Sequence, residues 1–429
     1  MREMKDSGIE WVGIIPKSWN ISRLKYIAKF FNGDRGKNYP SGEDLVDDGI
    51  AFLTSNNIHG IVLDCSQKKS KFITEERYNR LGGAKIQLND IAFCLRGSVG
   101  NCAINKTLTK GTVASSLMII RPIKASPDFI NYVLQTDVCD VQTIKAMNGS
   151  CAANLSAENV SNYYFVEPPI AEQKKITIFL DSKCSEIDAI SADIQKEIKT
   201  LEQYKRSVIT EAVTKGLNPD AEMKDSGIEW VGNIPVHWDV RPLYYYFAER
   251  KKKNYLGQEQ NLLSLSYGKV IRKDINTSEG LLPDSFNGYN IIEPGDIVLR
   301  LTDLQNDKRS LRTGLVKEHG IITSAYVTLK AAKEVVPEYF HYLLHAYDVM
   351  KVLYNMGNGV RQGLNYSELS KMHIVAPPID EQKNIAAYLD AKCKEIESII
   401  ESKKQQLTVI DSYKKSLIYE YVTGKKEVI

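Results

Sequence analysis

MKDSGIEWVG, at residues 4–13, occurs again letter for letter at residues 223–232. Each copy runs on to an Ile-Pro-x-x-Trp segment, which ends at Trp19 in the first copy and at Trp238 in the second. Identity over ten residues is far beyond chance, and an internal repeat indicates architecture more strongly than a single motif does. The chain is therefore predicted to be a tandem duplication of one unit.

A second repeated motif lies downstream, where PPIAEQK (168–174) matches PPIDEQK (377–383). The opening motif recurs after 219 residues and this one after 209, so about ten residues are missing from the second unit. They are missing between Trp238 and Pro377, which is also where the two units are least alike. We infer that the scaffold is duplicated and that the two domains it carries have diverged.

Each Pro-Pro pair is followed by a long segment that should be helical. Helix-forming residues dominate up to Lys215 and up to about Gly424, without internal proline or glycine. Roughly 45 residues at about 1.5 Å each predict a helix about 65 Å long. Apolar residues recur in steps of three and four, which is typical of a coiled coil. The expected seam consists of Ile187, Ile190, Ile194 and Leu201 in the first helix and Ile396, Ile399, Leu407 and Ile410 in the second.

Two equivalent helices in one chain are natural partners. We expect them to form an antiparallel coiled coil with pseudo-two-fold symmetry; the alternative is that each helix packs only on its own domain. The remaining sequence predicts two mixed α/β domains, with short β-rich runs such as 91–95 and 296–300. The expected fold class is α+β. Four segments are expected: 1–167 (first domain), 168–216 (central helix), 217–376 (linker and second domain) and 377–429 (C-terminal helix).

Composition places the chain among ordinary globular proteins. Hydrophobic residues make up 43% and charged residues 25%, and the net charge is +3. No apolar run approaches the roughly 20 residues that span a bilayer, and the first residues lack the apolar core of a signal peptide. A cytoplasmic protein without a membrane partner is expected. The seven cysteines are scattered and form no C-x-x-C pair, so neither a disulfide framework nor a thiolate metal site is predicted.

Motifs for catalysis are weak. Asp220, Glu222 and Lys224 resemble the carboxylates and lysine of metal-dependent nucleases, but they are contiguous in a proline-containing linker, which favours a solvated turn. His341 and His345 are one helical turn apart without the glutamate of a zinc protease. The sequence has no P-loop and no convincing glycine-rich adenosylmethionine loop. We therefore predict no catalytic residue, metal ligand or cofactor in this chain, which favours a binding protein.

Basic clusters recur inside both divergent domains. Lysine and arginine attract phosphates, and arginine, asparagine and glutamine can read base edges. A cluster of this kind is more often a solvated surface than a nucleic-acid contact. Its recurrence in both domains favours nucleic-acid binding only slightly. The candidate DNA-binding residues are Lys68, Lys69, Lys71, Arg77 and Arg96 in the first domain and Lys251, Lys252, Arg272, Lys273, Arg300, Arg309 and Arg312 in the second.

The order W-V-G-x-I-P-x-x-W, variable domain, P-P-x-x-E-Q-K and long helix, found twice, resembles the specificity subunit of type I restriction-modification systems. The resemblance covers the whole chain. It extends to the stretch that contains Arg361 and Gln362, which adds these two residues to the DNA-binding candidates; the first unit has no arginine at the matching place, because Ser150 to Leu155 read SCAANL there.

The resemblance implies two target-recognition domains, each reading one half of a bipartite, asymmetric site in double-stranded DNA. The paired helices would act as a spacer and would dock two modification (methyltransferase) subunits, which carry S-adenosylmethionine and methylate adenine. Restriction subunits would translocate and cut DNA. Two unlike readers on a fixed rod should recognise half-sites about one helical turn, roughly 34 Å, apart. Base flipping for methylation would occur on the partner, so this chain needs no catalytic residue.

Two functions from other classes stay open at this point. A metal-dependent nuclease with a cryptic site would need a carboxylate cluster, and none is visible in the sequence. A coiled-coil adaptor that binds only proteins would show no DNA affinity even with its partner subunits present.

Overall fold

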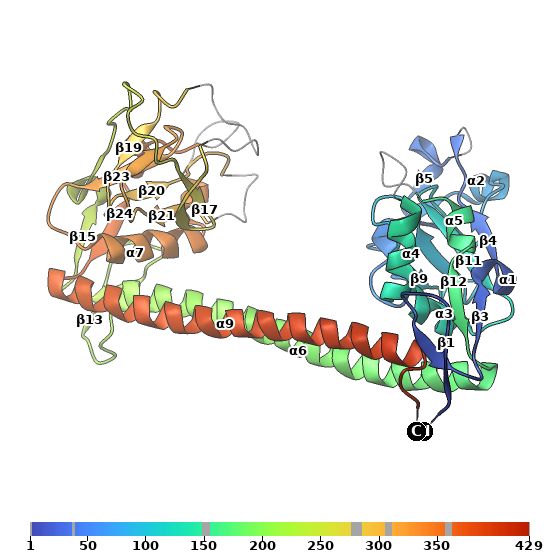
Figure 1. The fold of residues 1–429 in the computed structure, drawn as a ribbon. Coiled ribbons are helices and arrows are strands. Elements are labelled where there is room, and N and C mark those ends of the chain that lie inside the picture. Colours follow the sequence, from blue (N-terminus) through green and yellow to red (C-terminus); the bar gives the residue numbers. More distant parts are fainter. Residues whose placement is uncertain are drawn as a thin grey trace. The chain divides into compact units, whose positions relative to one another are not determined.

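The computed structural model describes residues 2–36, 39–147, 155–275, 285–304, 311–356 and 363–428 (Figure 1). The chain divides into two compact units. Unit 1 comprises Met1–Ile194 and Gln405–Ile429, and unit 2 comprises Gln195–Lys404. Both divisions fall inside the two long helices, α6 (Ile170–Lys215) and α9 (Ile379–Val422), so each unit contains a β-rich domain and a segment of both helices.

In unit 1 the central sheet has the strand order β4-β11-β8-β9 and is antiparallel. A second sheet, β10-β6-β7-β5, includes one parallel pair, and β12 pairs with β3. The strands are β1 (Met4–Asp6), β2 (Ile14–Pro16), β3 (Asn20–Arg23), β4 (Ala28–Asn32), β5 (Leu45–Val46), β6 (Ile50–Leu53), β7 (Lys71–Ile73), β8 (Ile91–Cys94), β9 (Cys102–Ile104), β10 (Gly111–Val113), β11 (Leu117–Pro122) and β12 (Tyr164–Glu167). The short helices are α1 (Leu24–Ile27), η2 (Gly42–Asp44), η3 (Ser55–Asn57), α2 (Glu75–Arg80), α3 (Pro127–Leu134), α4 (Asp137–Met147) and α5 (Ala157–Ser161).

Unit 2 repeats the central sheet, here in the order β16-β23-β20-β21, and the terminal pair, here β15 with β24. It differs in having a separate two-stranded hairpin, β17-β18. The strands are β13 (Met223–Asp225), β14 (Asn233–Pro235), β15 (Asp239–Pro242), β16 (Phe247–Glu249), β17 (Leu263–Ser266), β18 (Lys269–Arg272), β19 (Asn290–Ile292), β20 (Ile297–Leu299), β21 (Thr313–Leu315), β22 (Gly320–Ile322), β23 (Val327–Ala331) and β24 (His373–Ala376). The short helices are η4 (Leu243–Tyr245), α7 (Pro337–Val349), η5 (Val352–Asn355) and α8 (Tyr366–Leu369).

The repeated glutamine of P-P-x-x-E-Q-K joins each long helix to its domain. Gln173 is fully buried; its Oε1 accepts from the backbone N–H of Ser126 at 2.8 Å, and its Nε2 donates to the carbonyl of Pro168 at 2.9 Å. In unit 2 Gln382 does the same with Val336 and with the carbonyl of Pro377, at 2.9 and 2.8 Å. A buried amide that satisfies two backbone groups holds the first helical turn against the domain.

The neighbouring glutamate connects the two repeated motifs. In unit 1 the Nε1 of buried Trp19 donates to Glu172 at 2.9 Å, and in unit 2 Trp238 donates to Glu381 at 3.1 Å. The end of the other long helix also packs here, because a Cβ added to Gly424 would lie 2.9 Å from the ring of Trp19. Each Trp motif therefore receives the beginning of one long helix and the end of the other.

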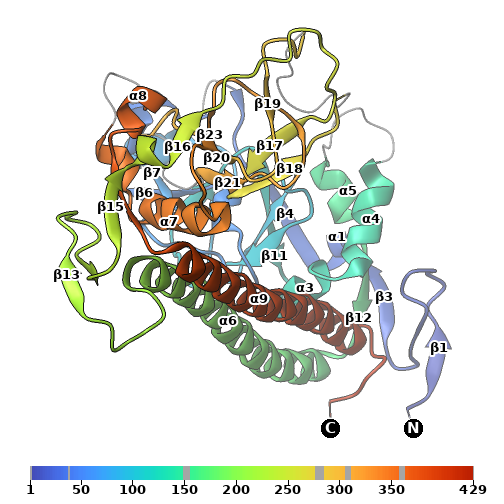
Figure 2. The same cartoon turned by 90° about the vertical axis from the view of Figure 1, so that its left-hand side faces the viewer.

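Within each unit α6 and α9 run antiparallel and in contact, side by side in Figures 1 and 2. In unit 1 Lys414 binds Asp188 at 2.6 Å, and in unit 2 Lys205 binds Glu397. These two ion pairs are equivalent, since both members are displaced by 209 residues between the units. The expected fold class is confirmed: an α+β chain with two β-rich domains, each followed by a long helix, and the helices contact each other.

The expected seam is wrong at two of its eight positions. Ile190 and Ile399 are 52% and 39% exposed. The buried and half-buried residues instead follow an unbroken alternation of three- and four-residue steps, as a coiled coil requires. They are Cys184, Ile187, Ser191, Ile194, Ile198, Leu201, Lys205 and Val208 in α6, and Cys393, Ile396, Ile400, Lys403, Leu407, Ile410, Lys414 and Leu417 in α9. The seam therefore includes serine and lysine, whereas the sequence predicts only apolar residues in it.

Candidate nucleic-acid interface

The lysine cluster of unit 1 lies on the surface segment that leads into β7. Lys68, Lys69 and Lys71 are all exposed, and the Nζ of Lys69 lies 3.5 Å from Nε2 of His59. The fully buried side chain of Asn57 holds the base of this segment: its Nδ2 donates to the carbonyl of residue 64 at 2.9 Å and to the hydroxyl of residue 70 at 3.2 Å. The segment therefore presents three ammonium groups from an anchored loop, which suits contact with phosphates.

The two arginines proposed in unit 1 differ in their surroundings. Arg96 follows β8 and is exposed. Arg77 lies in α2, where its Nε donates to Asp44 at 2.8 Å and only 20% of its side chain is exposed. The hydrogen bond from Arg77, with one from the backbone of Ser41, lowers the pKa of Asp44, so the carboxylate stays charged and largely neutralises this arginine.

In unit 2 the exposed basic candidates lie at two places. Lys251 and Lys252 follow β16 and are exposed, and Lys251 pairs with Glu249 at 2.8 Å. Arg272 ends β18 and pairs with Glu318, and Lys273, the next residue, is exposed. The remaining candidate, Arg300 beside β20, is half-buried.

The prediction that Arg312 binds DNA is wrong. Its side chain is fully buried, with Nη1 donating to the carbonyls of Arg300 and Thr302 at 3.1 and 2.9 Å. Nη2 donates to the carbonyl of Asp303 at 3.2 Å, and Nε donates to the hydroxyl of Tyr354 at 3.1 Å. A guanidinium in this position satisfies backbone carbonyls and cannot reach a ligand on the surface, so we exclude Arg312 from the DNA-binding candidates. Arg309, Arg361 and Gln362 lie outside the described residues.

Sequence reasoning overlooked the exposed aromatic and aliphatic residues of unit 2. Tyr267, Leu256 and Tyr255 are 83%, 80% and 75% exposed, more than any other large apolar side chain that the structure describes. Tyr267 lies between β17 and β18. The missed signal was a tyrosine followed by glycine between two β-rich runs, a place where asparagine or aspartate is usual.

The residues considered for catalysis are part of the fold. Lys224 donates to the carbonyl of Trp238 at 2.7 Å, while Asp220 and Glu222 are both exposed in the linker before β13. The rings of His341 and His345 lie 6.4 Å apart on α7, and burial lowers their pKa values to about 3 and about 4. Among the residues that the structure describes, no three histidine, cysteine, aspartate or glutamate side chains are placed to hold a metal ion.

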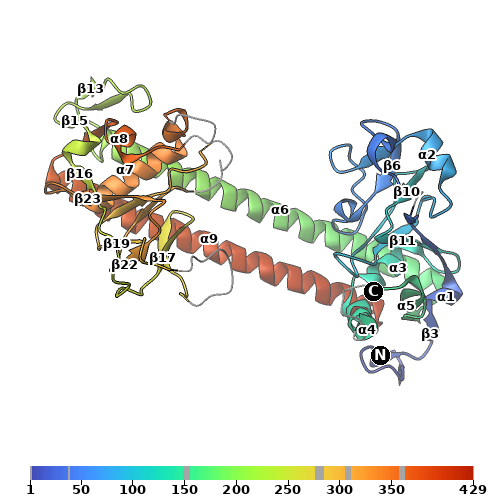
Figure 3. The same ribbon diagram turned by 90° about the horizontal axis from the view of Figure 1, so that it is seen from above.

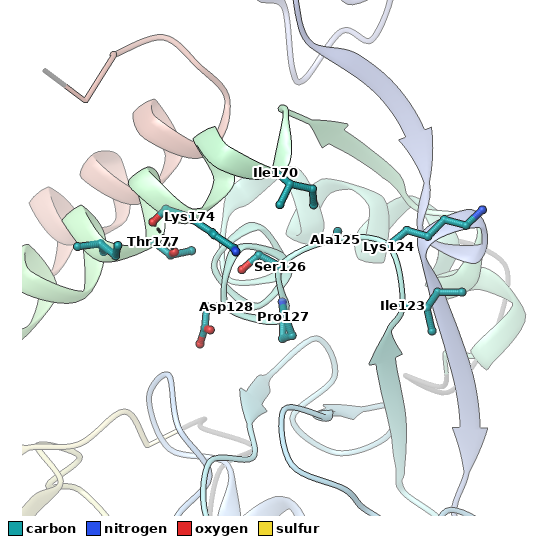
Figure 4. Close-up of a pocket in the computed structure, with 10 residues that line it drawn as sticks. Ile123, Lys124, Ala125, Ser126, Pro127, Asp128, Ile170, Lys174 and Thr177 are labelled. Carbon is teal, nitrogen blue, oxygen red and sulfur yellow. Dashed lines mark hydrogen bonds between the residues drawn. The ribbon is translucent and has the colours of Figure 1, made fainter.

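An open groove lies in unit 1 where the loop before α3 meets the first turns of α6 (Figure 4). Ile170 and Ile178 on α6 are 46% and 70% exposed along it, with Lys174 between them and Asp128 at the start of α3. In unit 2 the residues displaced by 209 are Ile379, Lys383 and Ala387, so the repeat keeps only part of this surface. The groove shows no cluster of catalytic groups.

These features define a class of protein: a duplicated α+β scaffold that presents two unlike, partly basic domains on paired helices. The family model described as "Type I restriction modification DNA specificity domain" matches residues 16–200 and 308–409, and the chain belongs to this family. It is a specificity subunit of a type I restriction-modification system, a family without catalytic function of its own, in which S-adenosylmethionine is bound by the methyltransferase subunit.

Curated relatives agree over the full length. A putative type I restriction enzyme specificity subunit (MjaX) of Methanocaldococcus jannaschii is 23% identical, with 97% of this chain and 96% of the relative covered. The EcoKI specificity subunit of Escherichia coli is 18% identical, with 96% and 90% covered. A solved chain from work on assembly and conformational transition of the type I restriction-modification system shares the fold, with a TM-score of 0.69 at 14% identity over 96% of this chain and 99% of that one. None of the helices described here has the length and apolar character of a membrane-spanning segment.

Proposed function

We propose that this subunit reads a bipartite, asymmetric site in double-stranded DNA, one half with the domain of each unit, and docks two methyltransferase subunits. One observation carries the proposal. The contacts that join domain to helix repeat residue for residue after 209 positions (Gln173 and Gln382, Glu172 and Glu381), while the exposed surfaces of the two domains differ. The repeated contacts are explained if the scaffold is kept alike so that it binds the same partner twice. The different surfaces are explained if each domain reads a different DNA sequence.

The proposed DNA contacts are the exposed basic residues of the two domains, together with half-buried Arg300. Lysines that neutralise phosphates supply affinity without sequence preference, whereas base edges are read by other side chains nearby. We propose Lys68, Lys69, Lys71 and Arg96 in unit 1 and Lys251, Lys252, Arg272, Lys273 and Arg300 in unit 2; Arg77 is a weaker candidate, and Arg309, Arg361 and Gln362 remain predictions.

Docking of two identical partners is supported by two exposed apolar patches on the helices. Patch A in unit 1 is Ile190 with Tyr413, 52% and 59% exposed, and patch B in unit 2 is Ile399 with Tyr204, 39% and 48% exposed. In unit 1 the Lys414–Asp188 ion pair places Ile190 and Tyr413 at the same level of neighbouring helices. Ile190 directly precedes the seam residue Ser191, and Tyr413 directly precedes the seam residue Lys414. In an antiparallel pair of helices, residues at this position flank the seam on the same side.

The two patches are equivalent, because Ile190 and Tyr204 become Ile399 and Tyr413 after a shift of 209 residues. Exposed isoleucine and tyrosine are typical of interface cores. Two equivalent patches, one in each unit, fit two copies of one partner. Restriction subunits are proposed to join the complex through the methyltransferase subunits.

The DNA-reading proposal is tested by mapping methylated adenines. The chain is co-expressed with the methyltransferase subunits of its own system, and long-read sequencing gives the methylated motif. Replacing residues 14–167 by the corresponding domain of a relative should change one half of the motif and leave the other half unaltered. A change in both halves, or in neither, contradicts the two-reader arrangement; a stable complex that methylates nothing and binds no DNA would favour the coiled-coil adaptor.

The docking proposal is tested separately by native mass spectrometry of the same complex. The paired substitutions Ile190→Asp and Tyr413→Asp in patch A should remove one of two methyltransferase subunits, and Ile399→Asp with Tyr204→Asp should remove the other. Val409→Asp is the matched control, because Val409 is 67% exposed on α9 and lies outside both patches. Retention of both subunits by the patch variants would place the docking surface elsewhere.

A further inference from the structure

The β17-β18 hairpin of unit 2 turns through Tyr267 and Gly268. Their φ angles are +45° and +79°, and the last paired residues on either side are Ser266 and Lys269. A two-residue turn with both φ angles positive strongly prefers asparagine, aspartate or glycine, because these conformations crowd a larger side chain. Tyrosine is a poor choice for the stability of this turn.

Packing in the core does not explain why position 267 is a tyrosine either. Its side chain is 83% exposed, the highest value for a large apolar side chain among the described residues, so the ring contributes almost nothing to the core. A bulky residue kept in a strained and exposed conformation points to a role outside folding.

The hairpin is nonetheless held in place on unit 2. Leu265 and Val270 lie over Gly314 of β21 so closely that a Cβ there would be 2.5 and 3.0 Å from their side chains. At the turn the Nζ of Lys269 lies 3.5 Å from Oε2 of Glu397 on α9, and β17 itself lies next to β22, as Figure 3 shows. One face of the hairpin is therefore packed on β21, and Lys269, which belongs to the other face, holds the turn. The rest of that other face lies on a ribbon that is fixed in place.

The outer face is suited to the groove of a duplex. Its cross-strand pairs are Ser264 with Ile271 and Ser266 with Lys269, and Ile271 is 47% exposed. Two paired strands about 4.8 Å apart fit the major groove, which is about 12 Å wide and admits a two-stranded ribbon. Serine hydroxyls can bond to base edges, and isoleucine or tyrosine can contact the methyl group of thymine.

The charges on the hairpin also favour a polyanion. Residues 263–273 read LSLSYGKVIRK and contain no carboxylate. Lys269 and Arg272 are 70% and 74% exposed, whereas their partners Glu397 and Glu318 are 44% and 34% exposed. The positive ends of both ion pairs therefore face solvent.

We propose that the β17-β18 hairpin enters the major groove of the half-site read by unit 2, with Tyr267 contacting the bases as a specificity-determining residue. This rests on the proposed function, in which unit 2 reads one half of the DNA site. In unit 1 the corresponding strands are not joined by a tight turn, because β6 and β7 are separated by residues 54–70. Reading by this hairpin is therefore a property of unit 2 alone.

The test is Tyr267→Asn in the full chain with its methyltransferase subunits. Asn-Gly is a preferred pair for this turn, so the melting temperature should stay the same or rise. Affinity for a short labelled duplex that carries the methylated motif should fall roughly tenfold, the effect of losing one good base contact. Tyr267→Phe, which keeps the ring, should retain most of the affinity. Tyr244→Asn is the control, since Tyr244 is 58% exposed in the same unit but outside the hairpin.

Duplexes in which one half of the motif is altered show which half-site Tyr267 contacts. In the variant, altering the half read by unit 2 should cost less than it costs the native complex, while altering the other half should cost the same. If Tyr267→Asn binds all duplexes like the native complex, the hairpin is not a reader, although DNA recognition stands. Loss of a methyltransferase subunit would show that the hairpin binds protein. If the native complex itself neither binds nor methylates a defined motif, the proposed function fails first.

Discussion

Replacing Gln173 by leucine should destabilise unit 1 by an amount that the structure allows us to work out. Leucine fills much of the same space but removes both amide hydrogen bonds. The carbonyl of Pro168 then stays buried without a donor, at a cost of about 1–3 kcal/mol. The N–H of Ser126 is partly accessible, so water offsets some of its loss. We expect a decrease of about 2–4 kcal/mol in the free energy of unfolding.

For a unit of this size the decrease corresponds to a drop of roughly 4–16 °C in melting temperature. Calorimetry gives the drop, and hydrogen exchange with mass spectrometry shows where it occurs. Faster exchange should be confined to unit 1 for Gln173→Leu and to unit 2 for Gln382→Leu. Gln203→Leu, at an exposed position of α6, is the control and should change little. A shift below about 1 kcal/mol, or exchange that increases equally in both units, would refute the view that this glutamine fastens helix to domain.

Three further outcomes are expected. Because burial lowers the pKa values of His341 and His345 to about 3 and about 4, the unfolded state binds more protons below its pKa of about 6.5. Unit 2 should therefore lose stability as the pH falls from about 6.5 towards 4, and hydrogen exchange in α7 of a His341→Gln, His345→Gln variant should be less pH-dependent. Replacing Lys68, Lys69 and Lys71 by alanine should weaken binding of any duplex and reduce the salt slope by about 0.9 per lost phosphate contact; an unchanged slope places the lysines away from the backbone. Inserting one heptad at the middle of both α6 and α9 keeps the seam in step and should lengthen the gap in the methylated motif, whereas an unchanged gap contradicts a spacer role.

The candidate interface could be predicted only in part. Exposed lysines such as Lys68 and Lys69 can be found from sequence, because charged side chains far from apolar runs stay in water. Arg312 could not be assigned in this way, since an arginine that bonds to buried carbonyls looks the same in sequence as one that meets a phosphate. Tyr267 was missed because an aromatic residue in a β-rich run is expected in the core. The Tyr-Gly pair is a local signal of a turn, and the φ angle and the exposure of the side chain show that the ring lies outside the core.

The sequence by itself determined the duplication, the fold class and the family, because identical motifs and uninterrupted helix-forming runs are local properties of the chain. It did not determine which face of each long helix is buried. Ile187 and Ile190 are both apolar and three residues apart, so periodicity alone admits either side of the helix. The tertiary structure decides, because in each unit the two helices pack against each other along one face and are joined there by an ion pair, Lys414 with Asp188 in unit 1 and Lys205 with Glu397 in unit 2. This packing places Lys205 and Lys414 in the seam and leaves Ile190 and Ile399 exposed to solvent.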